Sequence, residues 1–372
     1  MKIKEITDYL DRRLLPVYQE SYDNSGFLVG DKEQEVSNVL VTLDVTPAVV
    51  DEAIAKGCNL IVSHHPMIYS GMKRITPANQ TGRMVIRLLQ NHMAVYAAHT
   101  NLDNLDFGVS GALAQQLGLA DCRVLRPVEG VLRKLVTYVP LRHAAAVRQA
   151  LFEAGAGCIG AYDGCSWNSD GTGTFRASEG SHPFCGQIGE HHHEAETRIE
   201  VVYEQRIEQK LIAALIKAHP YEEPAYDLIA LGNRYARVGA GMVGALPHPM
   251  EVGDFFAMVK QRLRLPVVRA SRSTLPDAGT FARSRIRTVA LCGGSGSFLI
   301  GDAKAAGADI YLTGDLKYHD FQAAEDDIIL ADVGHFESEQ FAKDVLFNII
   351  SEKFTNFACR KSEKDIGYVY YI

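Results

Sequence analysis

The sequence predicts an α/β protein whose core is discontinuous and is interrupted by an α+β insert. Three observations support this prediction: strand-like runs alternate with helical segments early in the chain, the alternation resumes late, and a different pattern separates the two regions. The 372 residues, of which 47% are hydrophobic, are enough for sizeable cores. We expect the first half of the core at 1–127, the insert at 128–232 and the second half of the core at 233–372.

The early region follows the βαβ order that produces a parallel or mixed sheet with helices outside it. An N-terminal helix places Ile6, Leu10 and Leu14 on one face. The predicted strands of this region are 39–43, 59–63 and 94–98, and its further helices are 47–56 and 81–91. In the late region the predicted strands are 287–292, 309–313 and 328–332, and the predicted helix is 298–307. These two regions are expected to form one core together.

The insert has the order βαββαβ, which is the ferredoxin-like arrangement. Its predicted strands are 132–139, 158–166, 197–203 and 225–231, and its predicted helices are 142–154 and 205–218. We expect residues 171–175 to form a hairpin turn. We expect His191, His192 and His193 to lie on a solvated loop before a strand rather than at a metal site.

The composition argues against several classes of protein. A net charge of −7 disfavours a dedicated nucleic-acid-binding protein. No apolar run approaches the roughly 20 residues that span a bilayer, and the N-terminus lacks the apolar segment of a signal peptide. The seven cysteines are scattered, odd in number and without a CxxC pair, which favours a reducing compartment over a disulfide framework. We therefore expect a cytoplasmic protein without a membrane partner.

Two adjacent histidines, His64 and His65, follow a short β-branched run that ends before Pro66. Side chains at the carboxyl end of such a strand point into the crevice where open α/β sheets place their binding sites. Neighbouring residues on an extended segment project in different directions. Two imidazoles side by side therefore suit two metal ions better than one, since neutral imidazole is a common metal ligand.

Two further clusters of potential ligands also follow strand-like runs. His99 and Asp103 come after the run that ends at residue 98, and His335 comes directly after the run that ends at residue 334. His335 and Glu339 are four residues apart and share one helical face, whereas Glu337 points elsewhere. Each of these residues alone could be a helix cap or a satisfied core residue. Three clusters with the same placement favour metal binding, by the set His64, His65, Asp103, His335 and Glu339.

The chain resembles the Nif-three-like dinuclear-metal family, whose members are called GTP cyclohydrolase 1 type 2 homologs. The segments that carry the resemblance are Asp23-Asn24-Ser25-Gly26, Leu43-Asp44-Val45-Thr46-Pro47, Ser63-His64-His65-Pro66, His99-Thr100-Asn101-Leu102-Asp103, Thr313-Gly314-Asp315 and His335-Phe336-Glu337-Ser338-Glu339. The resemblance implies the same five ligands, with Glu339 as the bridge between two cations. It also implies a toroidal hexamer whose openings are capped by the insert, which is similar to PII and CutA-type modules.

Three residues are candidates for acid–base chemistry rather than for metal binding. Asp315 and His319 follow a predicted strand and overhang the same crevice, and His319 could act as a general acid or base or cap a helix. His99 could donate a hydrogen bond that orients the Asp103 carboxylate. The glycine-rich segment 293–297 is either an anion site at a helix N-terminus or a tight turn capped by Ser297.

We therefore expect a metal-dependent hydrolase in which two divalent cations (zinc, iron or manganese) generate a bridging hydroxide. The family name implies opening of the imidazole ring of GTP with release of formate, and hydrolysis of another nucleotide or phosphoester fits the same chemistry. The alternative is a non-catalytic regulatory or metal-handling protein whose PII-like insert senses a small ligand.

Overall fold

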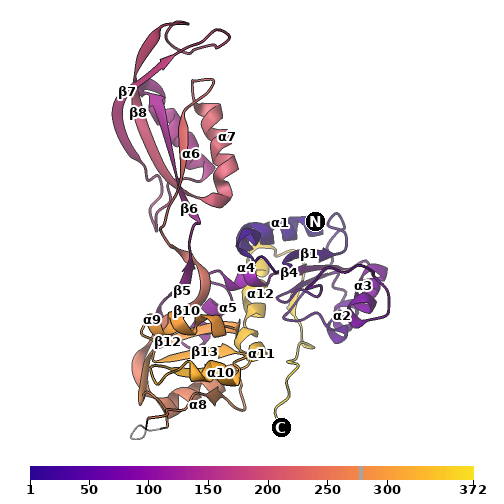
Figure 1. Cartoon of the computed structure of the whole chain (residues 1–372). Coiled ribbons are helices and arrows are strands. Elements are labelled where there is room, and N and C mark those ends of the chain that lie inside the picture. Colours follow the sequence, from indigo (N-terminus) through magenta and orange to yellow (C-terminus); the bar gives the residue numbers. More distant parts are fainter. Residues whose placement is uncertain (276–279) are drawn as a thin grey trace. The chain divides into compact units, whose positions relative to one another are not determined.

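The computed structural model describes residues 1–275 and 280–372, and the chain folds into two compact units. The core unit consists of Met1–Pro127 and Ala236–Ile372, and the insert unit is Val128–Tyr235. The sequence prediction placed the insert at 128–232. The predicted class, an α/β core with an α+β insert, is confirmed by the sheets and helices of each unit (Figure 1).

The first sheet of the core unit is built around four parallel strands, with one antiparallel strand at its edge. In spatial order its strands are β1 (Gly26–Val29), β4 (Ala94–Ala97), β3 (Leu60–Ser63), β2 (Val39–Thr42) and β15 (Cys359–Lys361). Every residue of β2, β3 and β4 is buried, as expected for central parallel strands covered on both faces. The carboxyl ends of β3 and β4 therefore lie together at one edge of the sheet.

The second sheet of the core unit combines parallel central strands with antiparallel neighbours. In spatial order its strands are β11 (Arg269–Ala270), β14 (Ile329–Asp332), β13 (Ile310–Gly314), β12 (Arg285–Ser295), β10 (Tyr235–Glu251) and β5 (Ala120–Val128). The sequence predicted that the two regions form one core but not how their strands pair, and the structure shows that the core unit contains two sheets. The continuous apolar runs identify buried strands but carry no information about which strands pair.

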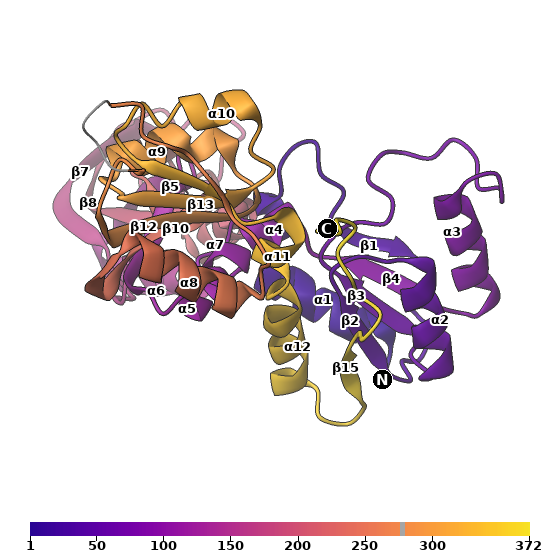
Figure 2. The same cartoon turned by 90° about the horizontal axis from the view of Figure 1, so that it is seen from below.

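The helices of the core unit cover the sheets and connect them. They are α1 (Ile3–Leu14), α2 (Pro47–Ala55), α3 (Gln80–Gln90), α4 (Thr100–Asp103), α5 (Val109–Gln116), α8 (Val252–Leu263), α9 (Ile300–Ala305), α10 (Tyr318–Gln322), α11 (His335–Glu339) and α12 (Ala342–Lys353). Local signals start two of them: Thr46 accepts a hydrogen bond from the Val49 amide before Pro47, and Asn79 caps α3. Helices α11 and α12 lie between the two sheets (Figure 2), with α11 against β12 and β13 and α12 against β2 and β15.

Short 3₁₀ helices complete the regular structure of the described residues: η1 (Pro16–Tyr18), η2 (Leu141–His143), η3 (Gln205–Ile207) and η4 (Ser297–Leu299). None of the helices within residues 1–275 and 280–372 has the length and apolar composition that crossing a membrane requires.

The insert unit has the predicted βαββαβ order and one antiparallel sheet. Its strands, in spatial order, are β7 (Trp167–Arg176), β8 (His191–Glu204), β6 (Leu132–Pro140) and β9 (Tyr226–Ala230). Helices α6 (Ala144–Ala154) and α7 (Glu208–Ala218) cover one face of this sheet (Figure 1), where Leu135, Leu151 and Leu215 contribute to a buried apolar cluster. The burial of these side chains is the main stabilising contribution to the unit.

Three predictions for the insert are wrong. Residues 158–166 do not form a strand, because Gly160 and Gly164 have left-handed backbone angles (φ of 60° and 63°) that interrupt an extended segment. The second strand is instead β7, and it contains residues 171–175, which were predicted as a turn. The three histidines 191–193, predicted on a loop, begin strand β8 and pair with β7.

Candidate metal centre

The predicted ligands come from the carboxyl ends of strands in both sheets of the core unit. His64 and His65 directly follow β3, and His99 follows the neighbouring parallel strand β4. Helix α11 begins at His335, and two residues separate it from the end of β14. Because α11 lies between the two sheets, His335 and Glu339 meet the histidines of the first sheet. All five predicted ligands thus lie in one cluster.

His64 is fully buried, and its ring is held so that Nε2 faces two carboxylates. Nδ1 donates a hydrogen bond to the Ala98 carbonyl oxygen at 2.8 Å. Nε2 lies 3.6 Å from Asp103 Oδ1 and 3.8 Å from Glu339 Oε1, which is too far for hydrogen bonds. Among the residues that the structure describes, His64 Nε2 and Asp103 Oδ1 are buried atoms without a hydrogen-bond partner.

These unpaired atoms fit a cation better than they fit a metal-free core. Ligands bound at 2.0–2.2 Å around one tetrahedral metal are roughly 3.3–3.6 Å apart. The separations at His64 are close to this value, whereas burying an imidazole nitrogen and a carboxylate oxygen without partners is costly. His64, Asp103 and Glu339 could therefore hold one divalent cation.

The other carboxylate oxygen of Glu339 faces a different pair of histidines. Oε2 lies 2.9 Å from His65 Nε2 and 3.0 Å from His335 Nε2. His335 and Glu339 approach each other because they are four residues apart on α11. His65, His335 and Glu339 form a second group that could hold a cation. Glu339 is thus shared by two groups of ligand atoms, one at each oxygen.

Carboxylates outside the cluster fix the rings of the second group. Asp44 Oδ1 accepts a hydrogen bond from His65 Nδ1 at 3.0 Å, and Asp315 Oδ2 accepts one from His335 Nδ1 at 2.7 Å. These bonds place the proton on Nδ1 and leave Nε2 of each ring to bind a cation, as is usual for metal-binding histidines. Asp315, predicted as a catalytic residue, therefore lies behind His335 and orients it.

His99 has a different partner from the one predicted. The sequence suggested that His99 orients Asp103, but its Nδ1 donates to Asp23 Oδ1 at 2.7 Å. Burial by itself raises the pKa of Asp23, yet hydrogen bonds from His99, Thr100 and Ser25 hold that pKa well below its usual range. A ring nitrogen of His99 lies within 4.8 Å of ring nitrogens of His64 and His65. Asp23 was given no role in the site by the sequence analysis.

The carboxylates and imidazoles of the cluster shift one another's proton affinities. Burial raises the pKa of Asp103 to about 6, and the nearby Glu339 adds to the effect. Burial acts in the same direction on Glu339, but the three histidines around it hold its pKa well below the usual range. Burial lowers the pKa values of His65 and His335, but hydrogen bonds with carboxylates outweigh it and raise them to about 10 and about 9. A cation that binds here must therefore displace protons from the imidazoles.

A glycine makes room for the shared carboxylate. Gly294 has φ of +64°, and a Cβ atom on it would lie 2.1 Å from Glu339 Oε1. Gly294 belongs to β12, and the amides of Gly293 and Gly294 donate to Ser110 Oγ and Ser338 Oγ, so neither amide is free for an anion. Ser297 is not the predicted cap, because Gly296 precedes η4 without a side-chain hydrogen bond. The glycine-rich run was the only sequence signal of this close approach.

His319, predicted as a general acid or base, is not brought to the cluster. It lies on α10, is exposed, and its Nδ1 contacts Gln322 Oε1 at 3.1 Å. It does not line either of the two cavities of the core unit that reach His65 and His335. Asp315 lines one of them.

The cluster is accessible from two cavities. One, of about 390 Å³, is lined by His65, His99, Asp103, Glu339 and exposed aromatic residues. The other, of about 440 Å³, is lined by His65, His335, Asp315, Arg269 and residues of the C-terminal segment. Both volumes fall in the range of small-molecule binding sites, about 300–1,000 Å³.

Comparisons with known proteins show which proteins this chain is similar to. The family model described as Duf34/NIF3 (NGG1p interacting factor 3) matches residues 1–365. A Bacillus subtilis protein named "GTP cyclohydrolase 1 type 2 homolog" is 41% identical over 324 residues, which cover 86% of this chain and 84% of the relative. The crystal structure of a Bacillus cereus protein related to NIF3 superposes with a TM-score of 0.84 at 35% identity, covering 100% of this chain and 99% of the other. Staphylococcus aureus protein SA1388 superposes with a TM-score of 0.80 at 30% identity and the same coverage.

Proposed function

We propose that this chain, which belongs to the Duf34/NIF3 family, is a metal-dependent hydrolase that holds two divalent cations in its core unit. The observation that carries the proposal is the position of Glu339, whose two oxygens face two separate groups of ligand atoms. His64 and Asp103 complete one group, and His65 and His335 complete the other.

The ligand types suit zinc, iron or manganese. Bound divalent cations would lower the pKa of a coordinated water toward neutrality and stabilise negative charge on the group under attack. The chain's own residues supply the orientation: Asp44 and Asp315 fix two of the imidazoles, and the Ala98 carbonyl fixes the third. This support limits the movement of the ligands, on which both affinity and rate depend.

His99 is the residue best placed to move a proton during hydrolysis. Asp23 accepts the hydrogen bond of Nδ1–H, so the other ring nitrogen is the one left to take a proton or to hold a cation. The Thr100 amide and the Ser25 hydroxyl donate hydrogen bonds to Asp23, and these bonds hold the His99–Asp23 pair in place. In this proposal His99 accepts a proton from the attacking water and returns it to the leaving group.

The substrate class follows from the walls of the 390 Å³ cavity and from the names of the relatives. Tyr22, Tyr69 and Phe298 line this cavity with more than half of each side chain exposed. Exposed aromatic rings are stacking surfaces for a planar heterocycle. The relatives are named homologs of a GTP cyclohydrolase. We therefore propose a nucleotide or a related phosphorylated heterocycle as substrate, with hydrolytic opening of the GTP imidazole ring as the reaction to test first.

The test is a hydrolase assay on the full chain after metal removal and reconstitution with zinc, iron or manganese. Formate release from GTP and phosphate release from nucleotides are measured in parallel. We expect activity that depends on added metal, is lost in Asp103→Asn and falls at least 100-fold in His99→Gln. His319→Gln serves as the control, because its side chain is remote from the cluster.

Two outcomes would contradict the proposal. If His99→Gln retains full activity, His99 has no role in proton transfer. If the reconstituted chain binds its metals yet hydrolyses none of these substrates, the non-catalytic alternative, a regulatory or metal-handling protein, is favoured instead. The toroidal hexamer expected from the family resemblance is a separate part of the proposal. Analytical ultracentrifugation of the reconstituted chain measures the oligomeric state.

A further inference from the structure

A second group of metal-ligand side chains lies in the insert unit, on strand β8 and the segment before it. His192 and Glu194 are two residues apart on β8, so they project from the same face of the sheet. His192 Nε2 lies 2.9 Å from Glu194 Oε2, and both side chains are about three-quarters buried. The preceding segment adds Cys185, and one ligand atom from each of the three residues lies within 4.8 Å of the others.

The approach of Cys185 depends on the glycine that follows it. Gly186 has φ of +80°, and a Cβ atom on it would lie 2.9 Å from His192 Cβ. The backbone beside Cys185 is thus packed directly against the imidazole, at a distance that only glycine permits. This close packing delivers the sulfur atom to the His192–Glu194 pair.

Aromatic side chains form the walls around this group. The Phe175 ring, which pairs with His192 across β7 and β8, has its centroid 5.3 Å from the imidazole centroid. The Cys185 thiol contacts the Tyr221 hydroxyl oxygen at 4.0 Å. Apolar walls strengthen the interaction between a cation and its ligands because they keep out water.

We propose that Cys185, His192 and Glu194 bind a divalent cation of the zinc class. A thiolate, an imidazole nitrogen and a carboxylate oxygen are the three ligand types that zinc uses. Three protein ligands leave the fourth tetrahedral position open for water or another ligand. Burial raises the pKa of the Cys185 thiol, so the thiol is protonated at neutral pH until a cation displaces the proton. The sulfur ligand distinguishes this site from the histidine and carboxylate cluster of the core unit.

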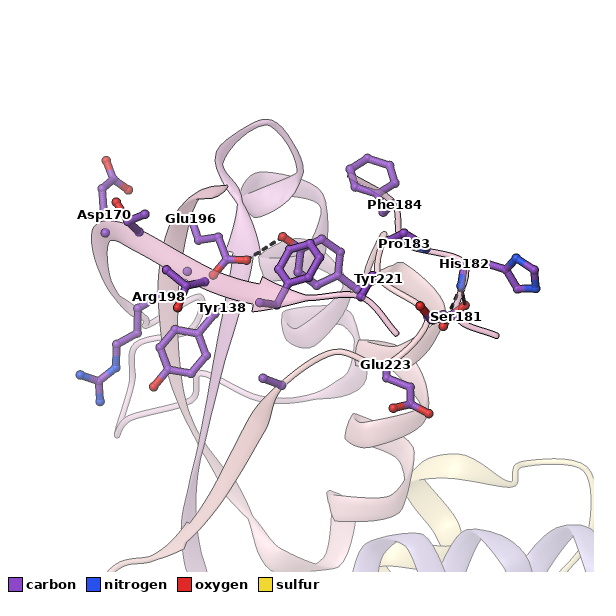
Figure 3. A pocket seen from close by; sticks show the side chains of 18 of the residues that line it. Tyr138, Asp170, Ser181, His182, Pro183, Phe184, Glu196, Arg198, Tyr221 and Glu223 are labelled. Carbon is purple, nitrogen blue, oxygen red and sulfur yellow. Dashed lines mark hydrogen bonds between the residues drawn. The ribbon is translucent and has the colours of Figure 1, made fainter. Parts of the chain in front are cut away.

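The proposed site adjoins a cavity of about 590 Å³ in the insert (Figure 3). Tyr221 lines this cavity, and its hydroxyl donates to Glu196 Oε1 at 2.7 Å, as the dashed line in Figure 3 shows. The same hydroxyl oxygen accepts from Cys185. Tyr221 therefore connects Cys185 to the cavity wall, and a cation that displaces the thiol proton would remove the hydrogen bond from Cys185 to Tyr221.

The experiment is a Co²⁺ titration of the full, reduced and metal-stripped chain. Cobalt bound to a thiolate absorbs in the near ultraviolet by charge transfer from sulfur, whereas cobalt bound only by histidine and carboxylate does not. We expect one equivalent of Co²⁺ to produce this band and Zn²⁺ to remove it. The band should be lost in Cys185→Ser, and His192→Gln and Glu194→Gln should each weaken Co²⁺ binding at least tenfold.

Cys292→Ser is the matched control, because Cys292 lines the 390 Å³ cavity of the core unit and is the thiol that could reach cobalt there. The proposal requires the band to persist in this variant. Circular dichroism and the cobalt content of the core cluster show whether Cys185→Ser is folded. A wild-type chain without the band, a band that survives in folded Cys185→Ser, or a band that disappears in Cys292→Ser alone would each overturn the proposal.

Discussion

His64 Nε2 lies 3.8 Å from Glu339 Oε1, a separation too long for a hydrogen bond and suited to two ligands of one cation. The second oxygen of Glu339 lies 2.9 Å from His65 Nε2, on the other group of ligands. The Glu339 carboxylate thus faces both His64 and His65, which are adjacent in the sequence and point in different directions.

The first prediction concerns the charge of Glu339. Glu339→Gln keeps the shape of the side chain but removes the negative charge between the two ligand groups, so we expect the loss of at least one metal per chain. Glu337→Gln is the matched control on the same helix, since Glu337 is not part of either group. Elemental analysis of both reconstituted variants measures the effect. Two metals retained in both would show that Glu339 is not the shared ligand.

The second prediction concerns Gly294. Gly294→Ala would place a Cβ atom 2.1 Å from Glu339 Oε1. It would also put alanine at a φ of +64°. We expect the carboxylate to be displaced and metal affinity to fall at least tenfold, with destabilisation of about 1–3 kcal/mol.

Gly301→Ala is the control for this substitution. Gly301 lies in α9, and a Cβ atom on it meets open space. Alanine is a better helix former than glycine, so this variant should gain about 0.5–1 kcal/mol and keep its metals. Calorimetric titration and urea unfolding measure both effects. Unchanged metal affinity in Gly294→Ala would refute the role assigned to this glycine.

The third prediction concerns pH and Glu52, which ties α2 to residues near the C-terminus. Burial alone raises the pKa of Glu52, but hydrogen bonds from Lys56, Ser362 and the Glu363 amide lower it from 4.5 to about 2. The carboxylate form is therefore favoured in the folded state. Its contribution to the free energy of unfolding is present above about pH 4.5 and is lost as the pH falls toward 2.

Glu52→Gln should lower the free energy of unfolding by about 2 kcal/mol at neutral pH, and the difference from the wild type should shrink below pH 4.5. Glu363→Gln is the control: this side chain is 78% exposed, so its ion pair with Lys56 should contribute little. Urea unfolding at a series of pH values tests both variants. A difference for Glu52→Gln that does not depend on pH would contradict the linkage.

The fourth prediction concerns the insert. Replacing residues 130–230 with a short Gly/Ser linker should leave the metals of the core unit bound, because all five proposed ligands lie in that unit. The ends can be joined: Gly239 packs so closely on the Arg126 carbonyl oxygen that a Cβ atom would lie 2.2 Å from it. A shortened chain that is folded by circular dichroism but binds no metal in the core would show that the insert supplies ligands to it.

The sequence indicated where the candidate histidines lie because each follows a buried strand. His64 and His99 follow neighbouring parallel strands, whose carboxyl ends lie at one edge of the first sheet, and His335 follows a strand of the second sheet. The spacing of His335 and Glu339 placed them on one helical face. The local sequence pattern was sufficient to predict the direction of a side chain where the periodicity of a single helix or strand determined it.

Contacts between distant segments could not be predicted in the same way. Asp23 meets His99 across 76 residues, and no local pattern relates them. Residues 158–166 have strand-like composition, but glycines in left-handed conformations interrupt them. The separation of the core into two sheets depends on strand pairing, and His319 follows a strand end without turning toward the cluster.

The most direct test of the central claim is the metal content of the core unit. Full-length Cys185→Ser protein, which lacks the thiolate proposed for the insert, is stripped and reconstituted, and its tightly bound metal is measured by elemental analysis. The shared position of Glu339 predicts two equivalents per chain, falling in Glu339→Gln. A reproducible ceiling of one equivalent, unchanged by Glu339→Gln, would contradict the account.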